Sequence, residues 1–384
     1  MPDLRIARGD AVALTRALVA VDSRNPDLVP GAPGEGAVAR LLAGILEDWG
    51  FDVALGEVVP GRPNVVARIG KRGGPRLMFN GHLDVVATEG MIHAPWDPVV
   101  RDGRIHGRGS ADMKSGIAAM CAAAALAAEH TAAEVIVAAV IDEENESLGT
   151  RALVDSGVRA EAAIVTEPTR LTIMPAHRGF VWIEISLRGR AAHGSRYDLG
   201  VDAIRHAGRL LAELDDLERG VLATRTHPLL GHASLHASTI AGGVGWSTYP
   251  ENCTLTVERR TVPGETEASV LHEVRDACAR LASRHPGFGA ESRVVFAQGP
   301  SDVATDAPVV RALAAALSGE GEDARIEGMS AWTDAAILNE AGIPAICFGP
   351  GDIRLAHAAE EYVEVAEIER ATRVMTRLAR EFRG

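Results

Sequence analysis

The sequence predicts an α/β fold: a mainly parallel sheet flanked by helices, with a separate α+β domain inserted into it. Two observations indicate this fold. In the first half of the chain, short and almost continuously apolar segments alternate with helical patterns, which is typical of parallel strands covered on both faces. After about residue 178 the segments alternate apolar and polar residues, as antiparallel strands with one exposed face do. We therefore expect a discontinuous domain of residues 1–177 and 299–384, and an inserted domain of residues 178–298.

The elements of the first segment follow from local patterns. Apolar residues at helical spacing predict a helix over residues 38–49, which Gly50 ends, and a second helical stretch covers residues 113–130. Asp102-Gly103, near the middle of residues 99–108, predicts a hairpin with a tight turn. Buried strands are predicted by four apolar or β-branched runs, at residues 64–69, 76–80, 134–141 and 162–166.

The inserted domain and the returning segment have their own patterns. Half-exposed strands are predicted at residues 180–187, 233–240 and 254–260. Helical patterns lie between and after them, at residues 201–217 and 265–283. From about residue 300 the chain returns to the first domain, with a helix at 307–317, a strand at 344–348 and a terminal helix at 363–382.

Charge and composition exclude several classes of protein. The chain has 384 residues, with 39 Lys+Arg against 52 Asp+Glu and a formal net charge of −13. Its arginines are scattered, whereas nucleic acids and anionic membranes select clustered cations, so we expect neither as a partner. The 4 cysteines are far apart, so we expect neither a disulfide framework nor a thiolate metal site. The apolar run at residues 117–128 is shorter than the ~20 residues of a membrane helix, and no secretory signal is visible, so we expect a cytoplasmic enzyme.

Candidate functional residues follow the predicted strands at the edge where open parallel sheets bind ligands. Histidine and carboxylate side chains dominate this set, and such nitrogen and oxygen ligands suit Zn²⁺, Co²⁺ or Mn²⁺. The candidates are His82 and Asp84 after residues 76–80, Asp112 after the hairpin, Glu143 and Glu144 after residues 134–141, Glu167 after residues 162–166, and His357 after residues 344–348.

Each candidate also has a purely structural explanation when taken alone. Asp112 precedes a predicted helix and could cap it, Asp142-Glu143-Glu144 could be a solvated charge run, and His357 could be an ordinary loop histidine. Independent structural causes do not explain why all of them fall at the ligand-binding edge. The joint pattern therefore favours a metal site.

Motifs for other chemistries are incomplete. Gly107-Arg-Gly109 lacks the third glycine of the dinucleotide fingerprint, and Lys114-Ser115 lacks the glycine that precedes the lysine of a phosphate loop. Gly328-Met-Ser330-Ala-Trp332 lacks the last glycine of the serine-hydrolase elbow.

Five motifs occur in a characteristic order along the chain. They are Gly81-His-Leu-Asp84, Gly107-Arg-Gly-Ser-Ala-Asp-Met-Lys-Ser-Gly116, Asp142-Glu-Glu144, Glu167-Pro-Thr169 and Ala356-His357. In order, spacing and the presence of an inserted domain, the chain resembles the dinuclear-zinc family of acetylornithine deacetylase, succinyl-diaminopimelate desuccinylase, aminoacylase and glutamate carboxypeptidase. The resemblance extends over essentially the whole chain.

The resemblance implies a site for two divalent metal ions, with zinc expected and cobalt or manganese as alternatives. One metal would be held by His82, Asp112 and Glu167, and the other by Asp112, Glu144 and His357, so that Asp112 bridges them.

The resemblance also implies roles for residues beside the ligands. Asp84 would accept the second ring N–H of His82 and so fix its tautomer. Glu143 would be the general base that takes a proton from the attacking water and passes it to the leaving amine. The peptide bond between Asp112 and Met113 would be cis.

In the inserted domain, the resemblance implies a lid that also forms a homodimer. His193, within Gly189-Arg-Ala-Ala-His193-Gly-Ser195, would reach the partner's active site and donate a hydrogen bond to the oxyanion. Arg260 would grip the substrate carboxylate, with Arg259 as the alternative. The structural alternatives are a strand-end histidine and a strand-face arginine.

Three departures from the family bear on the substrate. Ser247 stands where the family carries an asparagine, three residues before Pro250, and Glu258-Arg-Arg260 replaces the usual Asp-x-Arg. Trp332 stands before Thr333-Asp334, where the family has small residues, and would line or narrow the substrate pocket unless it packs in a core.

The predicted function is hydrolysis of the amide bond of an N-acyl amino acid or a related small N-acyl amine, with an acetyl, formyl or succinyl group. The alternatives are a metallo-dipeptidase or carboxypeptidase on the same scaffold, and a non-catalytic binding protein. The complete set of ligands and the base argue against the non-catalytic alternative.

Overall fold

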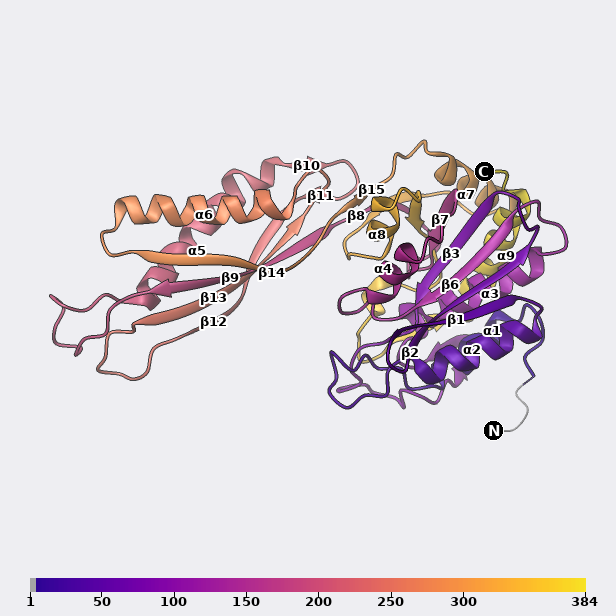
Figure 1. Cartoon of the computed structure of the whole chain (residues 1–384), viewed down its shortest axis with the longest axis horizontal. Helices are drawn as coiled ribbons and strands as arrows, with labels where there is room; N and C mark the ends of the chain where they lie inside the picture. The colour runs from indigo at the N-terminus through magenta and orange to yellow at the C-terminus, as the bar shows by residue number, and fades with distance from the viewer. Residues whose placement is uncertain (1–4) are drawn as a thin grey trace. The chain divides into compact units, whose positions relative to one another are not determined.

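The computed structural model describes residues 5–384, which form two compact units (Figure 1). The first unit contains the residues up to Pro175 together with Val303–Glu327 and Thr333–Gly384, and the second contains Ala176–Asp302 and Gly328–Trp332. Gly328–Trp332 joins the second unit because the Met329 carbonyl accepts the Arg178 N–H (3.3 Å) and Trp332 Nε1 donates to the Gly299 carbonyl (3.0 Å).

The first unit is built on a sheet whose centre is parallel. Its central strands lie in the order β6-β3-β7-β17, and each neighbouring pair is parallel. Antiparallel strands β1 and β2 extend one margin, and β8 extends the other. The bounds are β1 Asp52–Val59, β2 Arg62–Gly70, β3 Arg76–His82, β6 Glu134–Val140, β7 Ala162–Val165, β8 Ile173–His177, β16 Ile326–Met329 and β17 Ala345–Cys347. Strand β15 (Ser301–Asp302) pairs with Ala176 and His177 of β8 and, like these two residues, belongs to the second unit. The predicted α/β class is confirmed, with antiparallel margins that the sequence did not reveal.

Helices flank this sheet, and their bounds are α1 Ala11–Val19, α2 Gly36–Asp48, α3 Ser115–Ala127, α4 Leu148–Asp155, α7 Pro308–Gly319, α8 Ala335–Glu340 and α9 Val365–Glu381. Helix α3 packs against α1 and α9 and is buried at every position except Leu126. Its alanine-rich sequence explains this burial, because small side chains let neighbouring helices approach closely. The helix starts later than the predicted residue 113, because Asp112 and Met113 adopt non-helical conformations within an irregular turn, Ser110–Lys114.

A small antiparallel sheet, in the order β18-β5-β4, pairs two segments of the first unit that are far apart in the sequence. Strands β4 (Val100–Arg101) and β5 (Arg104–His106) form the predicted hairpin, with positive φ at Asp102 (51°) and Gly103 (76°). Strand β18 (Tyr362–Glu364) pairs with β5. The C-terminal segment that follows His357 is therefore fixed beside the segment that leads into Asp112.

The second unit is a four-stranded antiparallel sheet with two helices on one face (Figure 1). The strand order is β12-β13-β9-β14, and α5 and α6 pack on the inward-facing side chains Val181, Ile183, Ile185 and Leu187 of β9. The bounds are β9 Gly179–Arg188, α5 Ala203–Gly220, β10 Thr226–His227, β11 Gly231–His232, β12 Ser234–Gly242, β13 Asn252–Thr261, α6 Glu267–Arg284 and β14 Gly289–Gln298.

Two expectations about the whole chain can be compared with the structure. All four cysteines are free thiols, as their spacing predicted. None of the helices within residues 5–384 combines the length and the apolar character that crossing a bilayer requires.

Candidate metal centre

Three neighbouring parallel strands deliver the first candidate ligands. His82 is the last residue of β3, Glu143 and Glu144 follow β6, and Glu167 follows β7. Asp142, which precedes the glutamate pair, has a positive φ of 67° and turns the chain sharply at the end of β6. Because β6, β3 and β7 are adjacent and parallel, their carboxyl ends meet at one edge and bring these side chains together.

Asp112 reaches the same edge from the irregular turn before α3. A Cβ atom at Gly116 would lie 2.0 Å from the Thr166 carbonyl oxygen, so only glycine lets the start of α3 approach the end of β7 this closely. The Asp112–Met113 peptide bond is cis, as the resemblance implied.

His357 arrives on the loop that follows β17. A Cβ atom at Gly349 would lie 2.5 Å from the Thr166 carbonyl oxygen and 2.6 Å from that of Glu167, so this loop also depends on a glycine to approach β7. His357 itself has a φ of 60°, and its side chain is 52% exposed, in contrast to the buried His82.

The Asp112 carboxylate lies between the two imidazoles. Its Oδ1 is 3.1 Å from His82 Nε2, and its Oδ2 is 3.6 Å from His357 Nε2. Glu144 Oε2 is 3.0 Å from His357 Nε2, and Glu167 Oε1 is 3.9 Å from His82 Nε2. One carboxylate with an oxygen directed at each imidazole is the arrangement that bridging of two cations requires.

Glu143 lies among the candidate ligands rather than apart from them. Its Oε2 is 3.9 Å from His82 Nε2. Ligand atoms of His82, Glu143 and Glu167 all lie within 4.8 Å of one another, and so do those of His82, Asp112 and Glu144. By geometry alone, Glu143 could therefore be either a ligand or a base beside the ligands.

Asp84 approaches His82 with both its main chain and its carboxylate. The nearest partner of His82 Nδ1 is the backbone carbonyl of Asp84 at 3.0 Å, whereas the Asp84 carboxylate oxygen is 3.5 Å away. The carboxylate instead accepts the backbone N–H groups of Glu143 (3.1 Å) and Glu144 (3.2 Å). Asp84 thus fixes the ring of His82 through its main chain and the glutamate pair through its side chain.

Asn25 and Arg62, which hold Asp84 and Asp142 in place, were not among the residues predicted from the sequence. Asn25 Nδ2 donates to Asp84 Oδ2 and to Asp142 Oδ1, at 2.9 Å each, and Arg62 donates to the same Asp142 oxygen at 3.0 Å. Arg62 also pairs with the fully buried Glu35 (2.7 Å). These residues are distant from the site in sequence and belong to no local motif, so only the tertiary structure reveals the network.

Burial and mutual interactions shift the pKa values of the titratable groups in the cluster. Burial raises the pKa values of Glu143, Glu144 and Glu167, and repulsion between neighbouring carboxylates adds to this effect. Burial alone would lower the pKa of His82, but Asp112, Asp84 and Glu143 raise it well above its usual range. The hydrogen bond to Glu144 is the main cause that raises the pKa of His357 to about 9.

The donor set fits a divalent cation. Glu167 Oε1 is buried and has no hydrogen-bond partner among the described residues, although a buried carboxylate oxygen normally has one. Several buried carboxylates converge with two imidazoles, and a cation between them would supply both the counter-charge and the partner of Glu167.

His193 and Ser247, predicted in the inserted domain, lie in the second unit, and so does Trp332, which the sequence interpretation placed in the segment 299–384. His193 is exposed, and its Nδ1 faces Ser195 Oγ (2.8 Å) and accepts the Ser195 backbone N–H (3.2 Å). Ser247 is also exposed, and its carbonyl accepts the Gly194 N–H (2.7 Å). Trp332 is half-buried, and its ring makes a T-shaped contact with the ring of His177 (6.1 Å between centroids).

The structure separates Arg259 from Arg260. The side chain of Arg259 is fully buried and pairs with Glu265. Arg260 is 35% exposed, lies over the ring of Phe180 (5.3 Å to its centroid) and pairs with Glu258. Of the two arginines, only Arg260 is accessible to a ligand.

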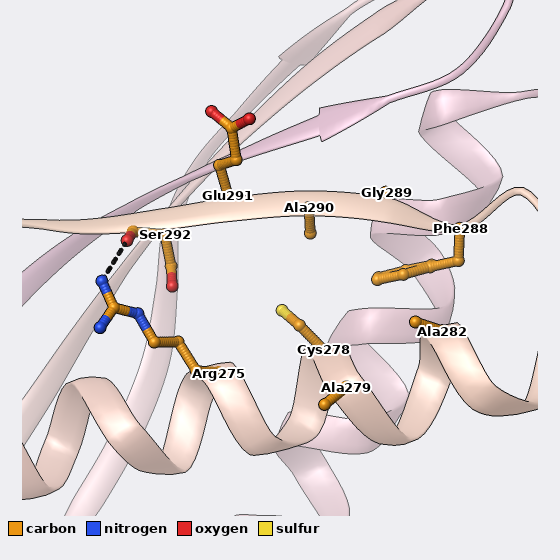
Figure 2. A pocket seen from close by; sticks show the side chains of 9 residues that line it. All are labelled: Arg275, Cys278, Ala279, Ala282, Phe288, Gly289, Ala290, Glu291 and Ser292. Atoms are coloured by element: carbon orange, nitrogen blue, oxygen red, sulfur yellow. Dashed lines mark hydrogen bonds between the residues drawn. The ribbon is translucent and has the colours of Figure 1, made fainter.

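A surface pocket of about 520 Å³ in the second unit lies between α6 and β14 (Figure 2). Cys278 and Phe288 line it, and burial raises the pKa of the Cys278 thiol to about 11, which leaves it a poor nucleophile at neutral pH. None of the lining residues belongs to either group of metal-ligating side chains.

The fold and the site are those of an α/β protein with candidate metal ligands at the carboxyl edge of a parallel sheet and with an antiparallel insert, an arrangement typical of a metallohydrolase. The chain belongs to peptidase family M20/M25/M40, whose sequence profile matches residues 78–381. It is accordingly an enzyme that hydrolyses amide bonds, as the sequence predicted, which argues against the non-catalytic alternative.

Individual relatives support this membership. The chain is 36% identical to an acetylornithine deacetylase of Myxococcus xanthus over 331 residues, covering 84% of each protein. It is 30% identical to a putative succinyl-diaminopimelate desuccinylase of Mycobacterium tuberculosis, covering 96% of this chain and 98% of the relative. Among solved structures, a tripeptidase of Staphylococcus aureus superposes with a TM-score of 0.81 over 98% of each chain at 19% identity, so it supports the fold alone.

Proposed function

We propose that this enzyme hydrolyses the amide bond of an N-acyl amino acid, or of a related small N-acyl amine, with two divalent metal ions. The position of Asp112, with one oxygen directed at His82 and the other at His357, carries this proposal. The names of the two sequence relatives, a deacetylase and a desuccinylase, support a short acyl group.

The proposed ligands of the first metal are His82, Asp112 and Glu167, and those of the second are Asp112, Glu144 and His357. Zinc is the expected metal, with cobalt or manganese as alternatives, since all three accept nitrogen and oxygen ligands. Such a metal pair would supply a water of lowered pKa and a Lewis acid for the acyl carbonyl.

Glu143 is proposed as the general base. Its backbone N–H is held by Asp84, next to a proposed ligand, and its carboxylate lies 3.9 Å from His82 Nε2. From this position the carboxylate would accept a proton from the attacking water. It would then donate that proton to the nitrogen of the leaving amine as the C–N bond breaks.

His193 and Arg260 are proposed to act on the substrate. Because His193 Nδ1 accepts the Ser195 N–H, a neutral imidazole carries its proton on Nε2, and this N–H is available to an oxyanion. Arg260 is proposed to bind the substrate carboxylate, and Ser247 and Trp332 to contact the substrate nearby. The proposed role of His193 in the active site of a partner subunit requires that the enzyme forms a homodimer. The cytoplasmic location also stays a prediction.

A hydrolysis screen tests the proposal. Metal-free protein would be supplied separately with Zn²⁺, Co²⁺ and Mn²⁺ and assayed on N-acetyl, N-formyl and N-succinyl amino acids and on dipeptides. We expect metal-dependent release of free amino groups from at least one N-acyl series, with kcat/KM above that for any dipeptide. Faster cleavage of dipeptides would instead support the peptidase alternative, and no hydrolysis with any metal would overturn the proposal.

A further inference from the structure

A buried glutamate lies four residues after His357 and takes no part in the chemistry described above. The side chain of Glu361 is fully buried. Its Oε2 accepts hydrogen bonds from Arg108 Nη1 (2.6 Å) and the Gly109 N–H (3.1 Å). Its Oε1 accepts the N–H groups of Ala111 (3.0 Å) and Asp112 (3.1 Å). One carboxylate thus binds four donors from a single short segment.

These contacts supply hydrogen-bond acceptors that the turn containing Asp112 lacks. The turn Ser110–Lys114 is a single irregular helical turn, with Asp112 and Met113 in non-helical conformations. Backbone N–H groups at such a position lack the regular acceptors of an α-helix, and leaving them buried and unpaired costs free energy. Glu361 provides the acceptor for two of them, at Ala111 and Asp112, and for the N–H of Gly109 just before the turn, so the conformation that presents Asp112 depends on this carboxylate.

The main chain around Glu361 is held to the same segment. The Glu361 carbonyl accepts the Gly107 N–H (3.3 Å), and the next residues form β18, which pairs with β5. On the other side, the Ala359 carbonyl accepts the Ile92 N–H (3.0 Å). The chain between His357 and Glu361 is short, so the position of Glu361 restricts where His357 can lie.

We propose that Glu361 is a positioning residue that sets the separation of Asp112 from His357 and thereby the affinity of the metal they share. This inference rests on the proposed ligand set. Because Asp112 and His357 come from two segments of the first unit that are far apart in the sequence, a link between their loops is required to keep an oxygen and an imidazole nitrogen at coordinating distance. Residues that orient ligands in this way commonly change metal affinity by ~10–100-fold.

The test compares two variants of Glu361 with a matched control. Glu361→Gln removes the charge and places an amide NH₂ against two donors, whereas Glu361→Asp keeps the charge but shortens the reach to the turn. Glu364→Gln is the control, because Glu364 lies on β18, the strand that directly follows Glu361, and pairs with Arg104 (2.8 Å) at a partly exposed site. Each metal-free protein is titrated with Co²⁺, with the absorption spectrum, the bound metal per chain and the far-UV circular dichroism recorded.

We expect wild type and Glu364→Gln to bind two Co²⁺ per chain with the same spectrum. The Glu361 variants should bind one of the two ions ~10–100-fold more weakly, with an altered spectrum, while circular dichroism shows a folded chain. Wild-type affinity and spectrum in a folded Glu361 variant would overturn the inference. If Glu361→Gln does not fold, Glu361→Asp decides by the same criterion. A wild-type chain that binds no metal would refute the proposed function itself, which is a different result.

Discussion

Arg259 and Arg260 are neighbours in β13, but their side chains lie on opposite faces of the sheet of the second unit. Arg259 is buried against Glu265 and Glu273 on the face covered by the helices, whereas Arg260 lies partly exposed over Phe180. Alternation along a strand enforces this division. Replacing Arg260 should therefore change substrate binding, whereas replacing Arg259 should change stability.

Replacing Arg260 should affect substrate binding and leave stability almost unchanged. We expect Arg260→Ala to raise KM about 10–100-fold for substrates with a free carboxylate, because a charge-assisted hydrogen bond is typically worth ~1.5–3 kcal/mol. Substrates whose carboxylate is converted to an amide should show a much smaller change. An equal loss on both kinds of substrate would contradict carboxylate recognition.

Replacing Arg259 should lower the free energy of unfolding of the second unit. Arg259→Met removes one of the two arginines that pair with Glu265 and Glu273, and Arg225 is the other. We therefore expect a cost below the ~3–5 kcal/mol that is typical of a fully broken buried pair. Denaturant unfolding would show a lower midpoint, with KM unchanged in the protein that remains folded. Unaltered stability in Arg259→Met would mean that the pair is not structural.

Glu143→Gln distinguishes a base from a ligand. As a base, Glu143 is needed for proton transfer but not for metal binding, so we expect kcat to fall by ~10²–10⁴ with the same metal content as wild type. The Asp84–Glu143 backbone contact does not involve the replaced group and should persist. Since Glu143 lies within 4.8 Å of ligand atoms of His82 and Glu167, loss of metal is the informative alternative. A variant that loses a metal ion would make Glu143 a ligand, and one that retains both ions and near-full kcat would remove it from the mechanism.

His177 should make the second unit sensitive to acid. It is buried, its Nδ1 lies 3.0 Å from the Arg178 carbonyl, and its Nε2 has no hydrogen-bond partner among the described residues. Burial lowers the pKa of His177 to about 4, and the hydrogen bond to Arg178 offsets this only in part. The unfolded chain has the ordinary pKa of ~6.5, so below it the unfolded state binds a proton that the folded state does not. Stability is therefore complete above that pH and falls on acidification from about pH 6.5 to 4.

The lowered pKa of His177 limits the resulting loss of unfolding free energy to about 3 kcal/mol. We expect metal-free wild type to lose more unfolding free energy between pH 7 and pH 4.5 than metal-free His177→Gln loses. His130→Gln, at an exposed position, is the control and should behave as wild type does. Identical pH dependence in wild type and His177→Gln would show that His177 does not carry this sensitivity.

The elements with strong local patterns could be predicted from the sequence, and so could the edge where the site lies. Parallel strands with continuous apolar runs, β3, β6 and β7, place their following residues at one edge whatever the details of packing. Strands β1 and β14 were missed for a physical reason. Residues of β1 are largely exposed, and a bulge near Val295 interrupts the alternation of β14, so neither shows the pattern of a buried strand.

The supports of the site could not be predicted, because they depend on contacts between segments far apart in the chain. Asn25 holds Asp84 from 59 residues away, and Glu361 binds the Asp112 N–H from 249 residues away. A single asparagine or glutamate in a loop has no periodicity or spacing that marks it. The main-chain carbonyl of Asp84, which is 3.0 Å from His82 Nδ1, was not predicted either; the Asp84 carboxylate lies 3.5 Å from the same nitrogen and also accepts the Glu143 and Glu144 N–H groups.

Subunit mixing tests whether His193 acts across a homodimer. His193→Ala and Glu143→Gln should each be nearly inactive for different reasons. In a mixed dimer the intact Glu143 of one subunit meets the intact His193 of the other, so one of the two sites has both residues. Random pairing of equal amounts makes half of the dimers mixed, and we expect activity to recover to about a quarter of wild type after subunit exchange. If His193 served its own subunit, every site would lack one residue, and the mixture would stay as inactive as its components. Recovery of activity would therefore support the homodimer and the proposed role of the Nε2 N–H of His193 together.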